Sequence, residues 1–130
     1  MKKKRVSLFD RALGDLKAVD VLLPSITDDV MLDICAYHCE QCIEKLIKFM
    51  IELSGHEYTE THDVNDLLEE LNDAEITGLV TPVISSLNEW VASIRYSSSI
   101  RSSRSRINSV VEVCHNLVEI VNTKLPKNLV

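Results

Sequence analysis

A long apolar segment without helix breakers sets the strongest constraint on how this chain folds. Between Thr27 and Gly55 there is no glycine or proline, and apolar residues recur every three or four positions. This spacing predicts one long helix, with an N-terminal cap at Thr27 and a left-handed stop at Gly55. A helix that is apolar over most of its surface is expected at the centre of a bundle.

Four more segments show helical spacing of apolar residues. The first ends at Pro24, the third is capped by Asp63, the fourth opens with Thr81-Pro82, and the last precedes Pro126. Between the last two, residues 97–106 predict a flexible basic loop that contains six serines and three arginines. We therefore predict an all-α fold, an antiparallel up-and-down helical bundle of four to five helices. It forms one domain over residues 1–130, with its core in residues 6–124.

The composition fits a globular protein that needs no disulfide or metal ion to stabilise its fold. The 130 residues are 45% apolar and 26% charged, with only three glycines and three prolines. No apolar run approaches the roughly 18 residues that span a bilayer. The basic start, residues 1–5, is followed at once by charged residues rather than an apolar stretch. We expect a cytoplasmic protein with no membrane association, whose four cysteines are reduced thiols.

Charge is unevenly distributed along the chain. Residues 6–94 carry four basic and eighteen acidic residues, whereas residues 1–5 and 95–130 each have a net charge of +4. We expect the middle of the chain to repel nucleic acid and its two ends to attract it, unless most of this charge is ordinary solvated helix surface.

Three cysteines have a spacing that also occurs in iron–sulfur enzymes. Cys35-x-x-x-Cys39-x-x-Cys42 matches the cluster motif of radical SAM enzymes, in which thiolates hold the iron. Here the three thiols follow the apolar stripe of a predicted helix, and Gln41 stands where that motif usually has an aromatic residue. We predict that these cysteines pack in the core as small hydrophobic side chains, and we expect no metal and no cofactor.

A polar stripe runs beside the cysteines on the same helix. His38, Gln41, Lys45 and Lys48 follow one another at steps of three or four residues, so they share a face. A histidine, an amide and two ammonium groups suit the binding of phosphate or a nucleotide. The alternative is a solvated face on which Glu44 and Lys48 form an i,i+4 pair.

Two short motifs lie outside that helix. In Thr61-His62-Asp63, capping accounts for Asp63, and His62 is either polar surface or part of a site. Arg95-Tyr96 leads into the arginine-rich loop and suits phosphate contact with base stacking, or else begins a solvated linker.

Taken together, these residues resemble the HEPN family. The resemblance rests on Tyr37-His38-x-x-Gln41-x-x-Glu44-Lys45-x-x-Lys48, Gly55, Thr61-His62-Asp63, Asp15-Leu16-x-Ala18 and Arg95-Tyr96. It implies an up-and-down bundle, commonly dimeric, with a nucleotide- or RNA-related role, often beside a partner minimal nucleotidyltransferase from a neighbouring gene. The predicted nucleotide- or RNA-binding residues are Tyr37, His38, Gln41, Lys45, Lys48, His62, Arg95 and Tyr96.

The chain departs from the nuclease members of that family. Their motif is an arginine followed, after four to six residues, by a histidine. None of the six arginines has a histidine at that distance, since His115 follows Arg106 by nine positions. We therefore expect a non-catalytic protein with no catalytic residues. The alternatives are a ribonuclease toxin of a toxin–antitoxin pair, with His38, His62 and Arg95 in a non-standard site, and a protein-interaction bundle.

The resemblance and the apolar content also predict a homodimer. Ile43, Ile47 and Ile51 widen the apolar stripe of the long helix, and the last helix is rich in valine. We expect these residues to supply a surface for self-association about a two-fold axis.

Overall fold

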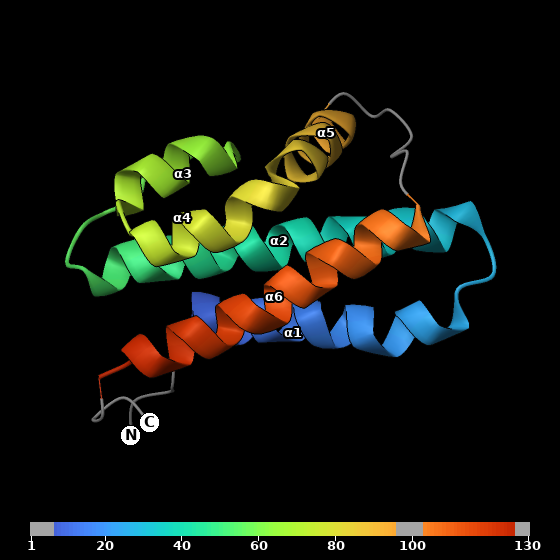
Figure 1. Cartoon of the computed structure of the whole chain (residues 1–130), viewed down its shortest axis with the longest axis horizontal. Coiled ribbons are helices and arrows are strands. Elements are labelled where there is room, and N and C mark those ends of the chain that lie inside the picture. Colours follow the sequence, from blue (N-terminus) through green and yellow to red (C-terminus); the bar gives the residue numbers. More distant parts are fainter. Residues whose placement is uncertain (1–6, 96–102, 127–130) are drawn as a thin grey trace, which may run out of the picture.

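The computed structural model describes residues 7–95 and 103–126, without the side chains of residues 94 and 95. Within these ranges there are six α-helices, two 3-10 turns and no strand, so the predicted all-α bundle is confirmed (Figure 1). The elements are α1 (Leu8–Leu22), η1 (Leu23–Ser25), α2 (Asp29–Leu53), α3 (Val64–Leu71), α4 (Ala74–Val80), η2 (Thr81–Val83), α5 (Ile84–Arg95) and α6 (Arg104–Lys124). None of the helices in the described ranges is both long enough and apolar enough to cross a bilayer.

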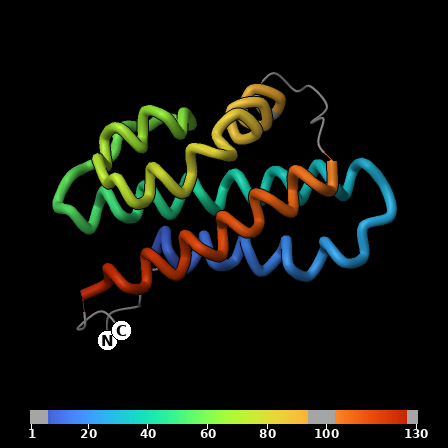
Figure 2. Tube along the Cα trace, viewed as in Figure 1, coloured from blue at the N-terminus to red at the C-terminus, as the bar shows by residue number. Residues whose placement is uncertain are grey.

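The long helix α2 is the centre of the molecule, as its apolar sequence predicts. It contacts α1, α3, α5 and α6, and its longest contact is with the antiparallel helix α1 (Figure 2). In the view of Figure 1, α6 crosses α1 and α2, while α3, α4 and α5 lie on the other side of α2 from α1. In the described ranges, no other helix covers the edge of α2 next to α1 that carries Tyr37, His38 and Lys45, whose side chains are exposed or half-buried.

Short polar side chains set the starts of the helices. Ser7 and Asp10 form a capping box at α1, and Asp63 caps α3 as predicted. The predicted cap of α2 is wrong by one residue, because Asp28 rather than Thr27 accepts the backbone N–H of Met31, at 2.9 Å. A carboxylate at this position also interacts favourably with the positive end of the helix dipole.

The helix predicted to open at Thr81 begins earlier. Asn72 adopts a left-handed conformation (φ 53°) that ends α3, and Asp73 directly caps α4. From Ala74 the chain then continues through α4, η2 and α5 without a gap. The prediction missed α4 because only Asn72 and Asp73 separate it from α3, and these two residue types are typical of loops and turns. Gly55, with a φ of 85°, follows α2 as predicted.

The last helix also begins within the segment predicted as a loop. Ser103 caps α6 at Arg104, so the last three residues of the predicted loop, 104–106, are helical, and residues 97–102 lie outside the described residues. Arg104 donates to the carbonyl oxygens of Leu23 (3.0 Å) and Ile26 (3.3 Å). This arginine therefore holds α6 against the turn between α1 and α2.

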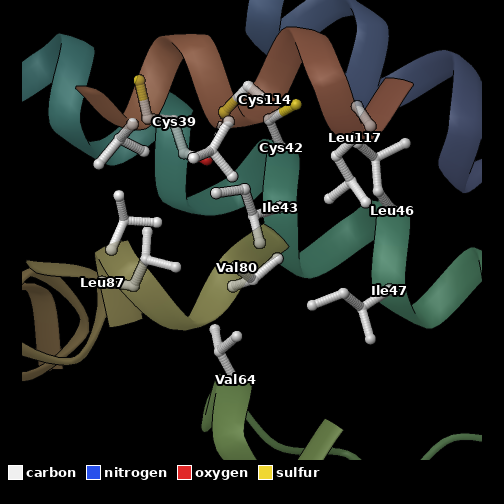
Figure 3. Packing of buried hydrophobic residues seen from close by; sticks show 14 of the residues in the cluster. Cys39, Cys42, Ile43, Leu46, Ile47, Val64, Val80, Leu87, Cys114 and Leu117 are labelled. Carbon is white, nitrogen blue, oxygen red and sulfur yellow. Dashed lines mark hydrogen bonds between the residues drawn. The ribbon is translucent and has the colours of Figure 1, made fainter. Parts of the chain in front are cut away.

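All four cysteines are buried thiols, which confirms that they pack in the core. Figure 3 shows three of them, Cys39, Cys42 and Cys114, among the buried apolar side chains. Cys114 of α6 donates to the carbonyl oxygen of Cys39 at 3.6 Å. Contacts with the thiols of Cys39 and Cys42, together with burial, raise the pKa of Cys114 well above its ordinary value. Thiols that stay protonated are poor nucleophiles and poor metal ligands. In the described ranges, no three His, Cys, Asp or Glu side chains are grouped to hold a metal ion.

The isoleucines that were expected to form a dimer surface lie inside the protomer. Ile43, Ile47 and Ile51 are fully buried among side chains of the neighbouring helices. This part of the dimer argument is wrong, because α3, α4 and α5 already cover that side of α2. The homodimer itself stays a prediction.

Candidate functional site

The polar residues of α2 fall into two separate groups. The first, the α1-facing network, consists of Asp15, His38 and Lys45. One Asp15 oxygen contacts His38 Nδ1 at 2.8 Å, and the other accepts from Lys45 Nζ at 2.5 Å. Asp15 is buried, whereas the side chains of His38 and Lys45 remain in part exposed to solvent. One carboxylate is thus shared by two basic side chains at the uncovered edge between α1 and α2.

An aromatic ring lies beside this network. Tyr37 is exposed, and its ring centroid is 5.3 Å from that of His38, in an edge-on arrangement. An exposed ring next to cationic groups suits the stacking of a nucleotide base while the cations meet its phosphate. Tyr37, His38 and Lys45 are the predicted site residues that the structure brings together here.

The second group, the α3-facing network, consists of Glu40, Gln41, Glu44, Lys48 and His62. Glu44 Oε1 accepts from Lys48 Nζ and lies next to His62 Nδ1, each at 2.8 Å, which confirms the i,i+4 pair. Gln41 Nε2 donates to Glu40 Oε2 at 2.8 Å. Glu40, Glu44 and Lys48 are buried, whereas the His62 ring is mostly exposed. This network joins α2 to the segment that precedes α3.

The two glutamates of this network have opposite pKa shifts. Burial, then the hydrogen bond and the repulsion from Glu44, raise the pKa of Glu40 to about 9. Burial alone would also raise the pKa of Glu44, but hydrogen bonds from Glu40, Lys48 and His62 outweigh it and lower that pKa. At neutral pH Glu40 is therefore a neutral acid and Glu44 an anion.

An open groove of about 440 Å³ lies beside His62, between the start of α3 and the side of α5. Among the described side chains that line it, two are carboxylates and none is a lysine or an arginine. The residues that line it are Thr61, His62, Asp63, Asp66, Asn88, Val91 and Ala92.

The structure thus divides the stripe that the sequence predicted as one face. His38 and Lys45 face α1, while Gln41, Lys48 and His62 belong to the other network. The side chain of Arg95 and the whole of Tyr96 lie outside the described residues. A binding role for the eight predicted residues stays a prediction.

Three carboxylates at the heart of these networks were not predicted as functional. Asp15 is 23 and 30 residues from its two partners, so no local pattern relates them. Glu40, Glu44 and Lys48 follow one another at steps of four on a helix that is otherwise largely apolar. That periodic polar row on a buried helix could have identified the second network.

Exposed apolar side chains also gather on α2. Val30, Ile34 and Tyr37 are 67%, 41% and 39% exposed and lie at positions i, i+4 and i+7. This spacing places them on one helix face, next to the α1-facing network. An apolar stripe of this kind, beside polar groups, marks a contact surface more often than bare solvent-facing helix.

The opposite half of the molecule is acidic. Residues 49–93 contain ten carboxylates and no lysine or arginine. Lys124 reaches Asp73 at 3.4 Å and Glu75 at 3.3 Å, and Arg106 reaches Glu89 at 2.9 Å. Among the described residues, this excess of carboxylates disfavours nucleic acid on this side.

Comparison with known proteins gives one match. The sequence matches the family model described as HEPN domain over residues 6–124, which is nearly the whole chain and includes both networks. No curated protein and no solved structure matches it.

Proposed function

The chain belongs to the HEPN domain family, and on that premise we propose that it is a non-catalytic partner subunit of a minimal nucleotidyltransferase. The nucleotide or RNA chemistry is then performed by the partner, and this chain contributes its α2 surface. The proposal combines what the family resemblance implies with the surface features of α2.

One observation supports a protein partner most directly. Val30, Ile34 and Tyr37 form an exposed apolar stripe on a helix that is otherwise nearly buried. Recognition of a helix by another protein commonly uses anchors at i, i+4 and i+7. Charged side chains at the edge of the stripe, those of the α1-facing network, supply the polar rim that such contacts have.

A non-catalytic role is supported by the absence of the nuclease motif from the sequence. His38 and His62 hydrogen bond to different carboxylates, Asp15 and Glu44. Phosphodiester cleavage needs a proton-transferring group beside a cation that stabilises the phosphate. The sequence lacks the Arg-x4-6-His spacing of the nuclease members, so the usual form of that pair is not encoded.

A nucleotide or RNA is the second candidate ligand, at the same face of α2. The exposed Tyr37 ring beside His38, with Lys45 about two turns further along the helix, favours this candidate. A phosphate would compete there with Asp15 for the two bases. The binding should fall steeply with salt, because each phosphate contact releases counterions.

Co-expression with a minimal nucleotidyltransferase encoded beside the gene tests the proposal. Ile34→Glu should abolish co-purification, since it places a charge in the centre of the stripe. Leu13→Glu is the matched control, because Leu13 is an exposed apolar residue on α1, outside the stripe. If both variants co-purify as wild type, the stripe is not the contact. If wild type forms no complex with the nucleotidyltransferase, the partner proposal is wrong.

Two further measurements separate the alternatives. Purified protein should leave RNA uncut, and cleavage that His38→Ala abolishes would instead support a ribonuclease toxin. Sedimentation at micromolar concentration tests the predicted homodimer. A dimer that Ile34→Glu dissociates, in the absence of any nucleotidyltransferase complex, would support a protein-interaction bundle.

A further inference from the structure

Two glutamates on adjacent turns of α2 each have one oxygen without a hydrogen-bond partner among the described residues. Glu40 and Glu44 are only 1% and 3% exposed. Their other oxygens are satisfied, that of Glu40 by Gln41 and that of Glu44 by Lys48 and His62. The two remaining oxygens, Glu40 Oε1 and Glu44 Oε2, are fully buried and have no hydrogen-bond partner among the described residues.

A single proton shared by the two carboxyl groups gives both buried oxygens a hydrogen-bond partner. The two carboxyl groups lie within hydrogen-bonding reach of each other, as expected for side chains four residues apart on a helix. If both were ionised, two acceptors of like charge would face each other in a buried site without a donor. A proton on Glu40 Oε1 gives Glu44 Oε2 its donor and removes one of the two charges.

Glu40 is the better position for that proton. Its only other partner is the neutral amide of Gln41, whereas Glu44 contacts the ammonium of Lys48 and the imidazole of His62. A carboxylate is stabilised by a neighbouring cation and by N–H donors, which Lys48 and His62 supply at Glu44, so Glu44 keeps the negative charge. The raised pKa of Glu40 and the lowered pKa of Glu44 have the directions that this geometry requires.

Few other charged groups face this pair. Lys48 comes from α2 itself, and His62 from the segment before α3, whose own buried residues are apolar. On α1, Asp15 is held in the α1-facing network. On α6, Arg106 bonds to Ser86 and Glu89 of α5, and the one buried titratable group is the Cys114 thiol.

We propose that Glu40 and Glu44 share one proton at neutral pH, and that this proton is a latch that holds the segment of residues 54–63 onto α2. Backbone hydrogen bonds of Ser54, Gly55 and His56 hold the start of that segment to the end of α2. Two side-chain contacts, those of Tyr58 and His62, attach its later part, and both depend on Glu44. His62 bonds to Glu44 directly, and the Tyr58 ring lies under the ammonium of Lys48, 5.1 Å from ring centroid to Nζ. Lys48 is placed there by its own bond to Glu44.

Loss of the proton opens the latch. When a hydroxide ion takes the proton from Glu40, the buried pair carries two negative charges and one lysine. Glu40 then repels Glu44 and competes for Lys48, which moves away from the Tyr58 ring and from Glu44. The later part of the segment loses both side-chain attachments, and the groove beside His62 changes shape because Thr61, His62 and Asp63, which line it, belong to this segment. The latch is independent of any nucleotidyltransferase partner.

The proton is tested on the wild-type protein by NMR titration of carbon-13-labelled glutamate carboxyl groups. One carboxyl should titrate near pH 9, far above the ordinary value of 4.5. The shift also makes stability depend on pH. Native Glu40 keeps a proton that the unfolded chain releases above pH 4.5, so the folding equilibrium constant falls as the pH rises from about 4.5 to about 9. The fall is at most about tenfold per pH unit up to the native pKa. Glu40→Gln, a neutral donor, should remove this slope. If every glutamate titrates near its ordinary value, the shared proton is excluded.

The latch is tested by amide hydrogen exchange in residues 54–63, corrected for the intrinsic rate at each pH. Wild type should lose protection as the pH rises through 9, whereas Glu40→Gln should keep it. His62→Ala should lose part of the protection at every pH, and His56→Ala, a histidine of the same segment with an exposed side chain, should behave as wild type. Equal loss of protection with pH in wild type and Glu40→Gln would overturn the latch. So would unchanged wild-type protection across pH 9 in a protein whose Glu40 does titrate there.

Discussion

The two networks of α2 use the same kinds of side chain, carboxylates with a lysine and a histidine, yet they differ in how many carboxylates meet the two bases and in how deeply they are buried. The α1-facing network has one carboxylate for two bases and is partly open to solvent. The α3-facing network has two glutamates for one lysine and one histidine, and all but the histidine and Gln41 are buried. Lys45 of the α1-facing network is therefore accessible to a ligand, whereas Lys48 of the α3-facing network is buried.

The difference lies in the neighbours of α2 rather than in α2. Helix α1 offers a single carboxylate, Asp15, at an edge that no other helix covers. On the other edge α2 supplies its own two glutamates, and the segment before α3 covers them. Burial removes water as a competing partner, so charge pairs there are tighter and less sensitive to salt. The predicted binding role is thus best assigned to Tyr37, His38 and Lys45.

The largest expected effect comes from removing the buried lysine. Lys48→Met leaves Glu44 as an uncompensated buried anion, and breaking such a pair costs about 3–5 kcal/mol of unfolding free energy. Lys45→Met, the matched change in the open network, should cost only about 1 kcal/mol. Urea denaturation of both variants at neutral pH measures the two values. Equal losses would mean that the networks do not differ in burial as described.

A smaller effect on stability, but a gain in binding, is expected when the open network loses its carboxylate. Asp15→Asn removes the anion that competes with phosphate for His38 and Lys45. Nucleotide or RNA affinity should rise by about 1 kcal/mol, which is about fivefold. Fluorescence anisotropy with labelled RNA at low salt measures it. Unchanged affinity in Asp15→Asn would argue that His38 and Lys45 do not contact phosphate.

The smallest expected effect is a difference between the two networks in how far salt weakens their ion pairs. A double-mutant cycle of Asp15 and Lys45 should give a coupling energy that declines between low and high salt, by about 0.5 kcal/mol. The cycle of Glu44 and Lys48 should give a coupling that salt does not change. A salt-sensitive coupling between Glu44 and Lys48 would show that water and ions reach that pair.

Sequence reasoning recovered what depends on local chemistry. The long helix that Gly55 follows, the Asp63 cap and the Glu44–Lys48 pair all follow from short-range spacing and are confirmed, whereas the cap of the long helix was predicted one residue too early. The buried cysteines follow from helical periodicity. The family was identified from spaced motifs over most of the chain, and the match over residues 6–124 confirms it.

What sequence reasoning missed depends on contacts between distant segments. The division of the polar stripe is set by Asp15 and His62, which come from other elements, so α2 alone does not predict it. The burial of Glu40 needs the covering segment to be known. The start of α4 was missed for a local reason, because Asn72-Asp73 ends one helix and caps the next within two residues.

Hydrogen exchange on the complex with a minimal nucleotidyltransferase tests the central claim most directly. We predict new protection in residues 30–45, which contain the exposed stripe of α2 and its half of the α1-facing network. Residues 52–75, the acidic segment around α3, should exchange as they do in the free protein. Protection confined to residues 52–75, with α2 unchanged, would contradict the assignment of the partner surface to α2.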